Sequence, residues 1–191
     1  MAAGVELSHF SALATRLADM KAIQALMISN QRTLMESCSS DREVANRLAD
    51  MIRDDEESLT ALNNAMTNLG VSAEPQDKTT QAVEALKDMM HSGDLTLFDK
   101  ALQHEGLKHQ LVMTGITVYK AAQTVGGNLQ ETIDPVNQVN FKNRAHQEQM
   151  KSILITLGTR EMVNQEPDQS IWAQTEDAIA SLKGIFGGLA S

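Results

Sequence analysis

The stretch LADMIRDDEESLTALNNAMTNLG, residues 48–70, carries the pattern that decides the fold. Its apolar residues recur three, four or seven positions apart, which is the spacing of one face of an α-helix. These residues are Leu48, Ile52, Leu59, Leu62, Met66 and Leu69. Gly70 follows them as a typical helix stop. Asp55 is the exception on this face, because it lies on one line between Leu48 and Leu62. The stretch therefore predicts a long amphipathic helix with one carboxylate turned inward.

The same periodicity predicts three further long helices. The four predicted helices cover residues 8–37, about 41–69, 96–125 and 134–162. The first two are joined by a turn at 38–41, where Ser40 or Asp41 can cap the second helix. The third stops at Gly126-Gly127, and the fourth begins at Asp134 with Pro135 in its first helical position. Residues 71–95 contain one short helix, about 79–90, and are long enough to carry the chain back along a bundle. Two hairpins joined by a long crossover make an all-α four-helix bundle, predicted for residues 1–166.

Residues 167–191 form a separate tail with its own amphipathic helix, Ser170–Leu189. Its apolar residues fall on one side, and they are Ile171, Ile179, Leu182, Ile185, Phe186 and Leu189. A helix that lies on a membrane surface has basic residues on its polar face, whereas this one has Glu176, Asp177 and a single Lys183. We expect the tail to pack on the bundle or on a partner in a homodimer.

Composition narrows the classes of function. The net charge is −9, and Lys and Arg are not clustered, so the sequence predicts no nucleic-acid partner. No stretch approaches the roughly 20 apolar residues of a membrane span, and the start lacks the basic and apolar regions of a signal peptide. The single cysteine, Cys38, fits a reducing compartment. These features predict a cytoplasmic protein with an aliphatic, methionine-rich helical core.

Polar residues interrupt the apolar face near the middle of every predicted long helix. They are Gln24, Asp55, Glu105, His109 and His146. Helical positions seven apart lie on nearly one line, which places Glu105 between Phe98 and Val112, and His109 between Leu102 and Ile116. His104 points elsewhere on its helix, so we interpret it as a solvated or edge residue. Carboxylates and imidazoles at one height on facing helices predict a metal site, with Asp55, Glu105, His109 and His146 as the candidate ligands.

The second and fourth predicted helices end alike, in Asn68-Leu69-Gly70 and Thr156-Leu157-Gly158. Superposing the glycines places Asp55 over Asn143 and Ser58 over His146. Each helix then keeps one half of the Glu-x-x-His pattern with which bundles bind two metal ions. The candidate set supplies two carboxylates, against about four in a di-iron site. The alternatives are a single iron or other divalent ion, or a polar layer whose members hydrogen-bond to each other.

Two stretches resemble the ferritin-like superfamily, and most closely its bacterial stress-induced, Yci-type (structural ferritin-like) branch. They are residues 48–70, quoted above, and ALKDMMHSGDLTLFDKALQHEGLKHQ, residues 85–110. The resemblance extends over about residues 10–160 through the order of the predicted helices. It implies a four-helix bundle, commonly a homodimer, with a di-iron site in many members.

Three functions remain open from the sequence. The leading hypothesis is a ferritin-like, stress-related protein with a degenerate metal site, non-catalytic or weakly metal-binding, that acts as a homo-oligomer. The second is a metalloenzyme with ferroxidase or peroxide-handling activity at a mid-bundle iron site. The third is an apolar-ligand pocket bordered by Tyr119 and the methionines.

Overall fold

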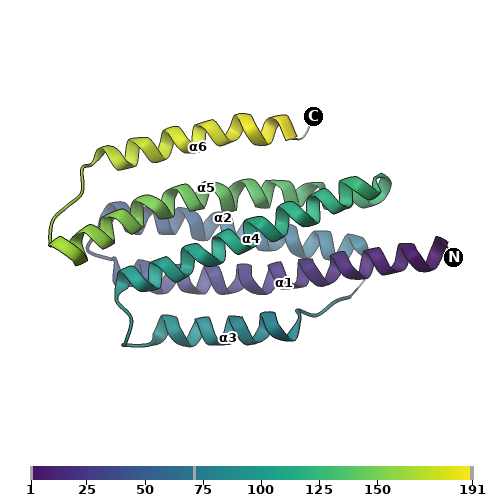
Figure 1. The fold of residues 1–191 in the computed structure, drawn as a ribbon, viewed down its shortest axis with the longest axis horizontal. Helices are drawn as coiled ribbons and strands as arrows, with labels where there is room; N and C mark the ends of the chain where they lie inside the picture. Colours follow the sequence, from purple (N-terminus) through teal and green to yellow (C-terminus); the bar gives the residue numbers. More distant parts are fainter. Residues whose placement is uncertain (1, 71, 190–191) are drawn as a thin grey trace.

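The computed structural model describes the backbone of residues 2–70 and 72–189, and the side chains of residues 10–70 and 72–182. Over the described backbone the chain forms six α-helices and no strand (Figure 1). Their bounds are α1 Ala2–Ser37, α2 Arg42–Leu69, α3 Asp77–His91, α4 Leu97–Val125, α5 Gly127–Val163 and α6 Ser170–Leu189. The predicted all-α class is confirmed.

Four long helices lie side by side in a ring. In this ring α1 packs on α2, α2 on α5, α5 on α4, and α4 on α1. Short turns join α1 to α2 and α4 to α5, whereas α3 lies within the long connection from α2 to α4. α3 packs on α1 and α4, and α6 packs on α5 on the opposite side of the molecule (Figure 1).

Helix ends follow local chemistry that is visible in the sequence. The Asp41 carboxylate accepts hydrogen bonds from the backbone N–H groups of Glu43 and Val44, and so caps α2. Gly70 ends α2 with φ 66°, a left-handed conformation that favours glycine. Thr96 and Asp99 form a reciprocal capping box at the start of α4.

The predicted start of the fourth long helix is wrong, because α5 begins at Gly127 and not at Asp134. Pro135 therefore lies inside the helix, where it cannot donate a hydrogen bond to the carbonyl of Glu131. Both residues are exposed, so water can reach that carbonyl. Leu129 and Ile133 are buried in the core, and their packing extends the helix ahead of the proline. α1 likewise begins earlier than predicted, at Ala2.

The apolar core consists of two clusters that lie at different positions along the helices. The buried residues of the first cluster range from Leu13 to Met27 in α1, from Leu62 to Leu69 in α2, from Leu107 to Ala122 in α4 and from Leu129 to Val136 in α5. The other contains Leu34, Leu48, Met51, Met150 and Ile153, among others. The buried polar side chains Asp55, Asn143 and His146 fall between the two clusters in sequence on α2 and α5, and the Lys108 side chain of α4 reaches them. A polar layer therefore separates two apolar layers.

α6 is attached to the ring by specific contacts. The Ser152 hydroxyl of α5 donates a hydrogen bond to the carbonyl of Ile171 (3.2 Å) and also meets the Thr175 hydroxyl. The Arg47 guanidinium of α2 lies 4.6 Å from the centre of the Trp172 ring and pairs with Glu176 at 2.9 Å. The predicted apolar positions Ile185, Phe186 and Leu189 lie outside the described side chains.

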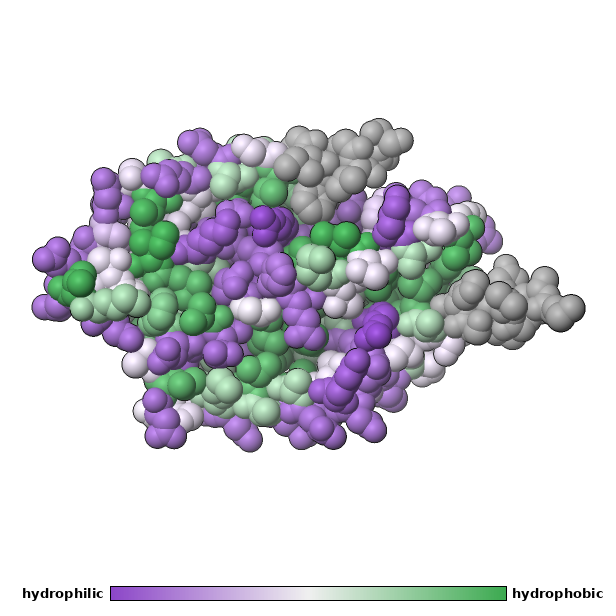
Figure 2. Space-filling view, viewed as in Figure 1, coloured by the Kyte–Doolittle hydropathy of each residue, from purple (hydrophilic) through white to green (hydrophobic). Residues whose placement is uncertain are grey.

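On the face of the molecule shown in Figure 2, hydrophobic residues form short patches between hydrophilic ones. Among the described residues, no helix has the length and apolar character needed to cross a membrane. The prediction of no membrane span agrees with this finding.

A candidate functional site at the centre of four helices

Lys108 occupies the centre of the ring, and its side chain is fully buried (0% exposed). α4 places it there in a line of buried residues spaced seven apart, Ala101, Lys108, Gly115 and Ala122. The other three are small, which allows neighbouring helices to approach α4 closely. At Gly115 the approach is so close that an added Cβ atom would lie 1.8 Å from the Asn140 Oδ1 atom of α5.

The ammonium group of Lys108 has three acceptors. Its Nζ atom lies 2.5 Å from Asp55 Oδ2, 3.0 Å from Asn143 Oδ1 and 3.0 Å from His146 Nδ1. An ammonium group carries three hydrogens, so these contacts use all of them. Burial lowers the pKa of Lys108, and the charge of Asp55 acts in the opposite direction. Such a buried cation is stable only with its partners in place.

Asp55 is the buried anion of this network. Its Oδ2 atom accepts a second hydrogen bond from the Gln31 side-chain amide of α1 (2.7 Å). Burial raises the pKa of Asp55, but the charge of Lys108 and its hydrogen bond outweigh burial and hold the pKa below its usual range. Asp55 is therefore ionised at neutral pH and balances the charge of Lys108. The two helices that face each other across the ring, α2 and α4, are thus joined by a buried ion pair.

His146 connects the buried ion pair to the surface. Its Nδ1 atom accepts from Lys108, so its Nε2 atom carries the proton and donates to Asp54 Oδ2 at 3.2 Å. The histidine is 1% exposed, whereas the Asp54 side chain is 44% exposed. Adjacent carboxylates on α2, Asp54 and Asp55, thus contact the same imidazole from two sides. One faces solvent and the other faces the core.

At the surface, Asp54 and Lys142 form an ion pair between α2 and α5. Asp54 Oδ1 lies 3.2 Å from Lys142 Nζ, and Lys142 also pairs with Glu57. The hydrogen bond from His146 lowers the pKa of Asp54, although burial opposes it. Burial alone lowers the pKa of Lys142, but hydrogen bonds to Glu57 and Asp54 outweigh it and raise that pKa. The network runs without a break from Gln31 in the core to this surface pair.

His104 lies one turn before Lys108 and is also fully buried. Neither of its ring nitrogens has a hydrogen-bond partner among the described residues. Burial, followed by the charge of Lys108, lowers its pKa from 6.5 to about 3. His104 is therefore neutral at physiological pH, and the interpretation as a solvated or edge residue is wrong.

The structure divides the four predicted metal ligands into two groups. Asp55 and His146 meet in the buried network, with Asp55 Oδ1 3.3 Å from His146 Nδ1. Glu105 and His109 instead lie at the rim, where both contact the side-chain amide nitrogen of Gln147, at 3.0 and 3.3 Å. The prediction that these two residues face the seam is wrong, because α4 is rotated by about one residue. His104 and Lys108 take the inward positions instead.

The residues present do not fit a metal ion at mid-ring. Among the described side chains, no group of three or more His, Cys, Asp or Glu is gathered where it could hold a metal. The ammonium group of Lys108 lies between Asp55 and His146, the two predicted ligands that do come together. A metal cation next to this ammonium would be repelled by it.

Sequence reasoning missed Lys108, His104 and Asp54. A signal for Lys108 was present, because Ala101, Gly115 and Ala122 repeat at intervals of seven and Lys108 completes the series. Small residues at such intervals indicate the face of a helix that touches its neighbours. The link of Asp54 to His146 has no counterpart in sequence spacing.

The chain is similar to a protein named DNA nickase from Nostoc sp. (strain PCC 7120 / SAG 25.82 / UTEX 2576). The two are 42% identical over 177 residues, which is 93% of this chain and 50% of the relative. The chain thus spans about half the length of the curated relative that it matches. No model of a protein family matches the chain, and no solved structure matches it.

These comparisons correct several expectations from the sequence. The identification as a Yci-type, ferritin-like protein is wrong, since the relative carries a different name and no family model supports the assignment. The predicted stress-related and metal-binding roles are wrong for the same reason. The predicted absence of a nucleic-acid partner also conflicts with a relative that is named for its action on DNA. Net charge describes the whole surface, and it does not report how charges are arranged at one site.

Proposed function

We propose that this chain takes part in nicking DNA, that is, in hydrolysing one phosphodiester bond of a duplex. The observation that carries the proposal is the 42% identity to the DNA nickase over 93% of this chain. An identity of this level over nearly the whole chain makes a shared fold and shared chemistry the simplest expectation. The relative is about twice as long, so its remaining half can contribute to its activity.

The surface pair of Asp54 and Lys142, backed by His146, is the proposed reactive group. Phosphodiester hydrolysis needs a group that orients and deprotonates water, and a positive charge beside the phosphoryl oxygens. Asp54 supplies a half-exposed carboxylate whose position is fixed by the His146 imidazole (3.2 Å). Lys142 supplies the cation, 3.2 Å from the same carboxylate. His146 acts by positioning Asp54, because both of its nitrogens are already bonded.

Lys142 can exchange one of its partners for a phosphate group. Its pair with Glu57 is at the surface, where the Glu57 side chain is 72% exposed. Exposed ion pairs contribute only about 0–1 kcal/mol to the free energy of unfolding, so breaking the Lys142–Glu57 pair costs little stability. The α5 backbone and the contact with Asp54 would keep the lysine in place. A phosphate oxygen would then replace the Glu57 carboxylate at the ammonium group.

The arrangement of the long helices supports a more specific description of the fold. We propose that the helical ring is a four-helix bundle of two hairpins joined by the α3 crossover. The division into a bundle, residues 1–166, and a tail, residues 167–191, also stays a proposal. Both are supported by the packing of α1, α2, α4 and α5 around one polar layer.

A plasmid assay tests the proposed function. Purified chain is incubated with supercoiled DNA, and the appearance of open-circular DNA is followed on a gel. We expect the wild-type chain to nick the plasmid and Asp54→Asn to lower the rate by at least about 100-fold, a typical size for loss of acid–base assistance. Asp50→Asn is the matched control, because Asp50 is an exposed carboxylate one turn earlier on α2 that pairs with Arg53. If wild type and Asp54→Asn give the same rate, the assigned site is wrong.

A further inference from the structure

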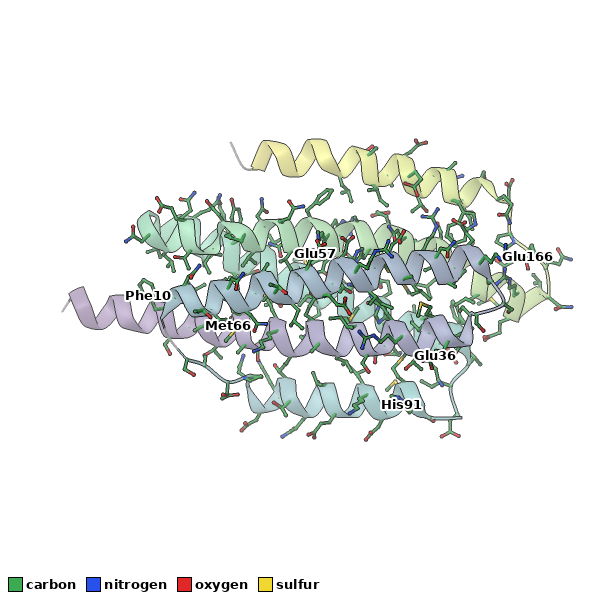
Figure 3. The ribbon with its side chains drawn as sticks, turned by 180° about the vertical axis from the view of Figure 1, so that it is seen from behind. Phe10, Glu36, Glu57, Met66, His91 and Glu166 are labelled. Atoms are coloured by element: carbon green, nitrogen blue, oxygen red, sulfur yellow. The ribbon has the colours of Figure 1, made fainter. Side chains whose placement is uncertain are left out.

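A surface pocket lies directly beside the Asp54–Lys142 pair, between α2 and α5. Its volume is about 280 Å³, and its lining residues are Glu57, Ser58, Ala61, Pro135, Gln138, Val139 and Lys142. Glu57 lies on the side of α2 that faces α5 (Figure 3). Lys142 is thus shared between the proposed reactive group and the wall of the pocket.

Ser58 distinguishes this pocket from the others. The residue is 2% exposed, and its hydroxyl has no hydrogen-bond partner among the described residues. A buried hydroxyl without a hydrogen-bond partner lowers the stability of the fold. The Ser58 hydroxyl can both donate and accept a hydrogen bond, so it is free to bond to a ligand in the pocket. A larger pocket of about 590 Å³ between α1, α2 and the crossover has none of the unpartnered buried groups among its described lining residues.

The lining of the pocket selects the class of ligand. Ala61, Pro135 and Val139 supply apolar surface, while Ser58 and Gln138 supply hydrogen-bonding groups. The charge of Lys142 is already balanced by Asp54 and Glu57, so the pocket interior does not attract an anion. A flat, neutral ring with hydrogen-bonding edges fits such a combination of surfaces. A phosphate group fits only at the outer side, on Lys142.

Resting on the proposed nicking function, we propose that this pocket is a subsite for one nucleobase of the DNA strand next to the cleaved phosphate. The base lies on Ala61 and Val139, and its edge bonds to the Ser58 hydroxyl. Exocyclic amino groups of bases can donate to Glu57 once Lys142 has turned to the phosphate. Enzymes that modify a DNA base take that base out of the stack into a pocket, which shows that an unstacked base can be held in this way.

Binding of single-stranded oligonucleotides tests the subsite separately from nicking. The probes are a fluorescent deoxyoligonucleotide and an abasic deoxyribose-phosphate strand of equal length, which keeps the charges and lacks the bases. We expect the wild-type chain to bind the strand with bases more tightly. Ala61→Met fills the pocket and should reduce this affinity to that for the abasic strand. Ser58→Ala should reduce it by about five- to tenfold, as expected for one lost hydrogen bond, without loss of protein stability.

Ala121→Met, an exposed position on α4, is the control, and it should leave both affinities unchanged. Equal affinity of the wild type for the two strands, or absence of binding to either, overturns the subsite. So does an Ala61→Met variant that loses affinity for both strands alike. If the chain nicks plasmid but binds both strands equally, the proposed function holds and the subsite is wrong. If it prefers the strand with bases but does not nick plasmid, the subsite holds and the proposed function is wrong.

Discussion

Lys108 and Asp55 dominate the energetics at the scale of single residues. Both side chains are fully buried, and each is the counter-charge of the other. Removing one member of such a pair leaves an unpaired charge in the core, whereas replacing both removes the problem. The remaining hydrogen bonds of the pair are made with Gln31, Asn143 and His146.

We therefore expect Lys108→Met to lower the free energy of unfolding by about 3–5 kcal/mol, because Asp55 stays buried without its cation. The double variant Lys108→Met/Asp55→Leu should recover most of this loss. Urea unfolding followed by circular dichroism measures both. A single variant that costs less than about 1 kcal/mol would show that the ion pair is not formed in the core.

His104 should make stability depend on pH. Its pKa is about 3 in the folded chain and 6.5 in the unfolded one, so between these values the unfolded state binds an additional proton. Lowering the pH from 6.5 towards 3 therefore lowers the free energy of unfolding, by about 1.4 kcal/mol per pH unit at most. Replacing His104 by Gln should remove this contribution.

The difference between wild type and His104→Gln isolates this effect from the acidic residues. Asp55 also loses its contribution as the pH falls below its usual pKa, but it does so in both proteins. Denaturant unfolding at intervals from pH 7 to pH 4 gives the slope for each protein. Parallel curves would mean that His104 is protonated, or hydrated, in the folded chain.

At the scale of elements, the contact between α4 and α5 depends on Gly115. An alanine Cβ there would lie 1.8 Å from Asn140 Oδ1 and 2.9 Å from the Met20 methyl group, so these buried side chains or α4 itself would have to shift. We expect Gly115→Ala to destabilise the chain by about 1–3 kcal/mol.

Gly106→Ala on the same helix is the matched control. Its Cβ meets nothing within 4 Å, and the position is exposed. Alanine is the better helix former, so this variant should be stabilised by about 0.5–1 kcal/mol. Thermal unfolding compares the two. If both substitutions stabilise α4, the close approach at Gly115 is not present.

The elements also show what the sequence can predict. A cap and a glycine located the ends of α2, because these signals act within one turn of the chain. The start of α5 was missed, since the burial of Leu129 and Ile133 outweighs a local proline signal. The rotation of α4 was also missed. A face with apolar residues at both Leu102 and Leu107 fits two registers, and only the contact with neighbouring helices decides between them.

Asp55 and His146 were found as members of the site because a polar residue on an apolar face is visible in one sequence. Lys108 was not found, since a lysine can extend to solvent from many positions. Its burial becomes understandable only with Asp55, which lies on another helix 53 residues away. The link from His146 to Asp54 spans 92 residues, and no local pattern predicts such a contact.

At the scale of the whole molecule, the net charge of −9 opposes broad, non-specific attraction to DNA. The proposed site needs only one cation, Lys142, to bind a phosphate group. Its exposed ion pair with Glu57 can be replaced by a phosphate at a small cost in free energy. Binding should therefore be local and should involve few phosphate contacts. The other half of the longer relative can add to the affinity in that protein.

The most direct test of this account is the rate at which the purified chain converts supercoiled plasmid to open circles, compared with its Lys142→Ala and Lys151→Ala variants. Lys151 lies on the same helix, pairs with Glu148 at the surface, and has no role in the proposed site. We predict nicking by wild type and Lys151→Ala at equal rates, and a large loss with Lys142→Ala. No nicking by the wild-type chain, or equal nicking by all three proteins, would contradict the account.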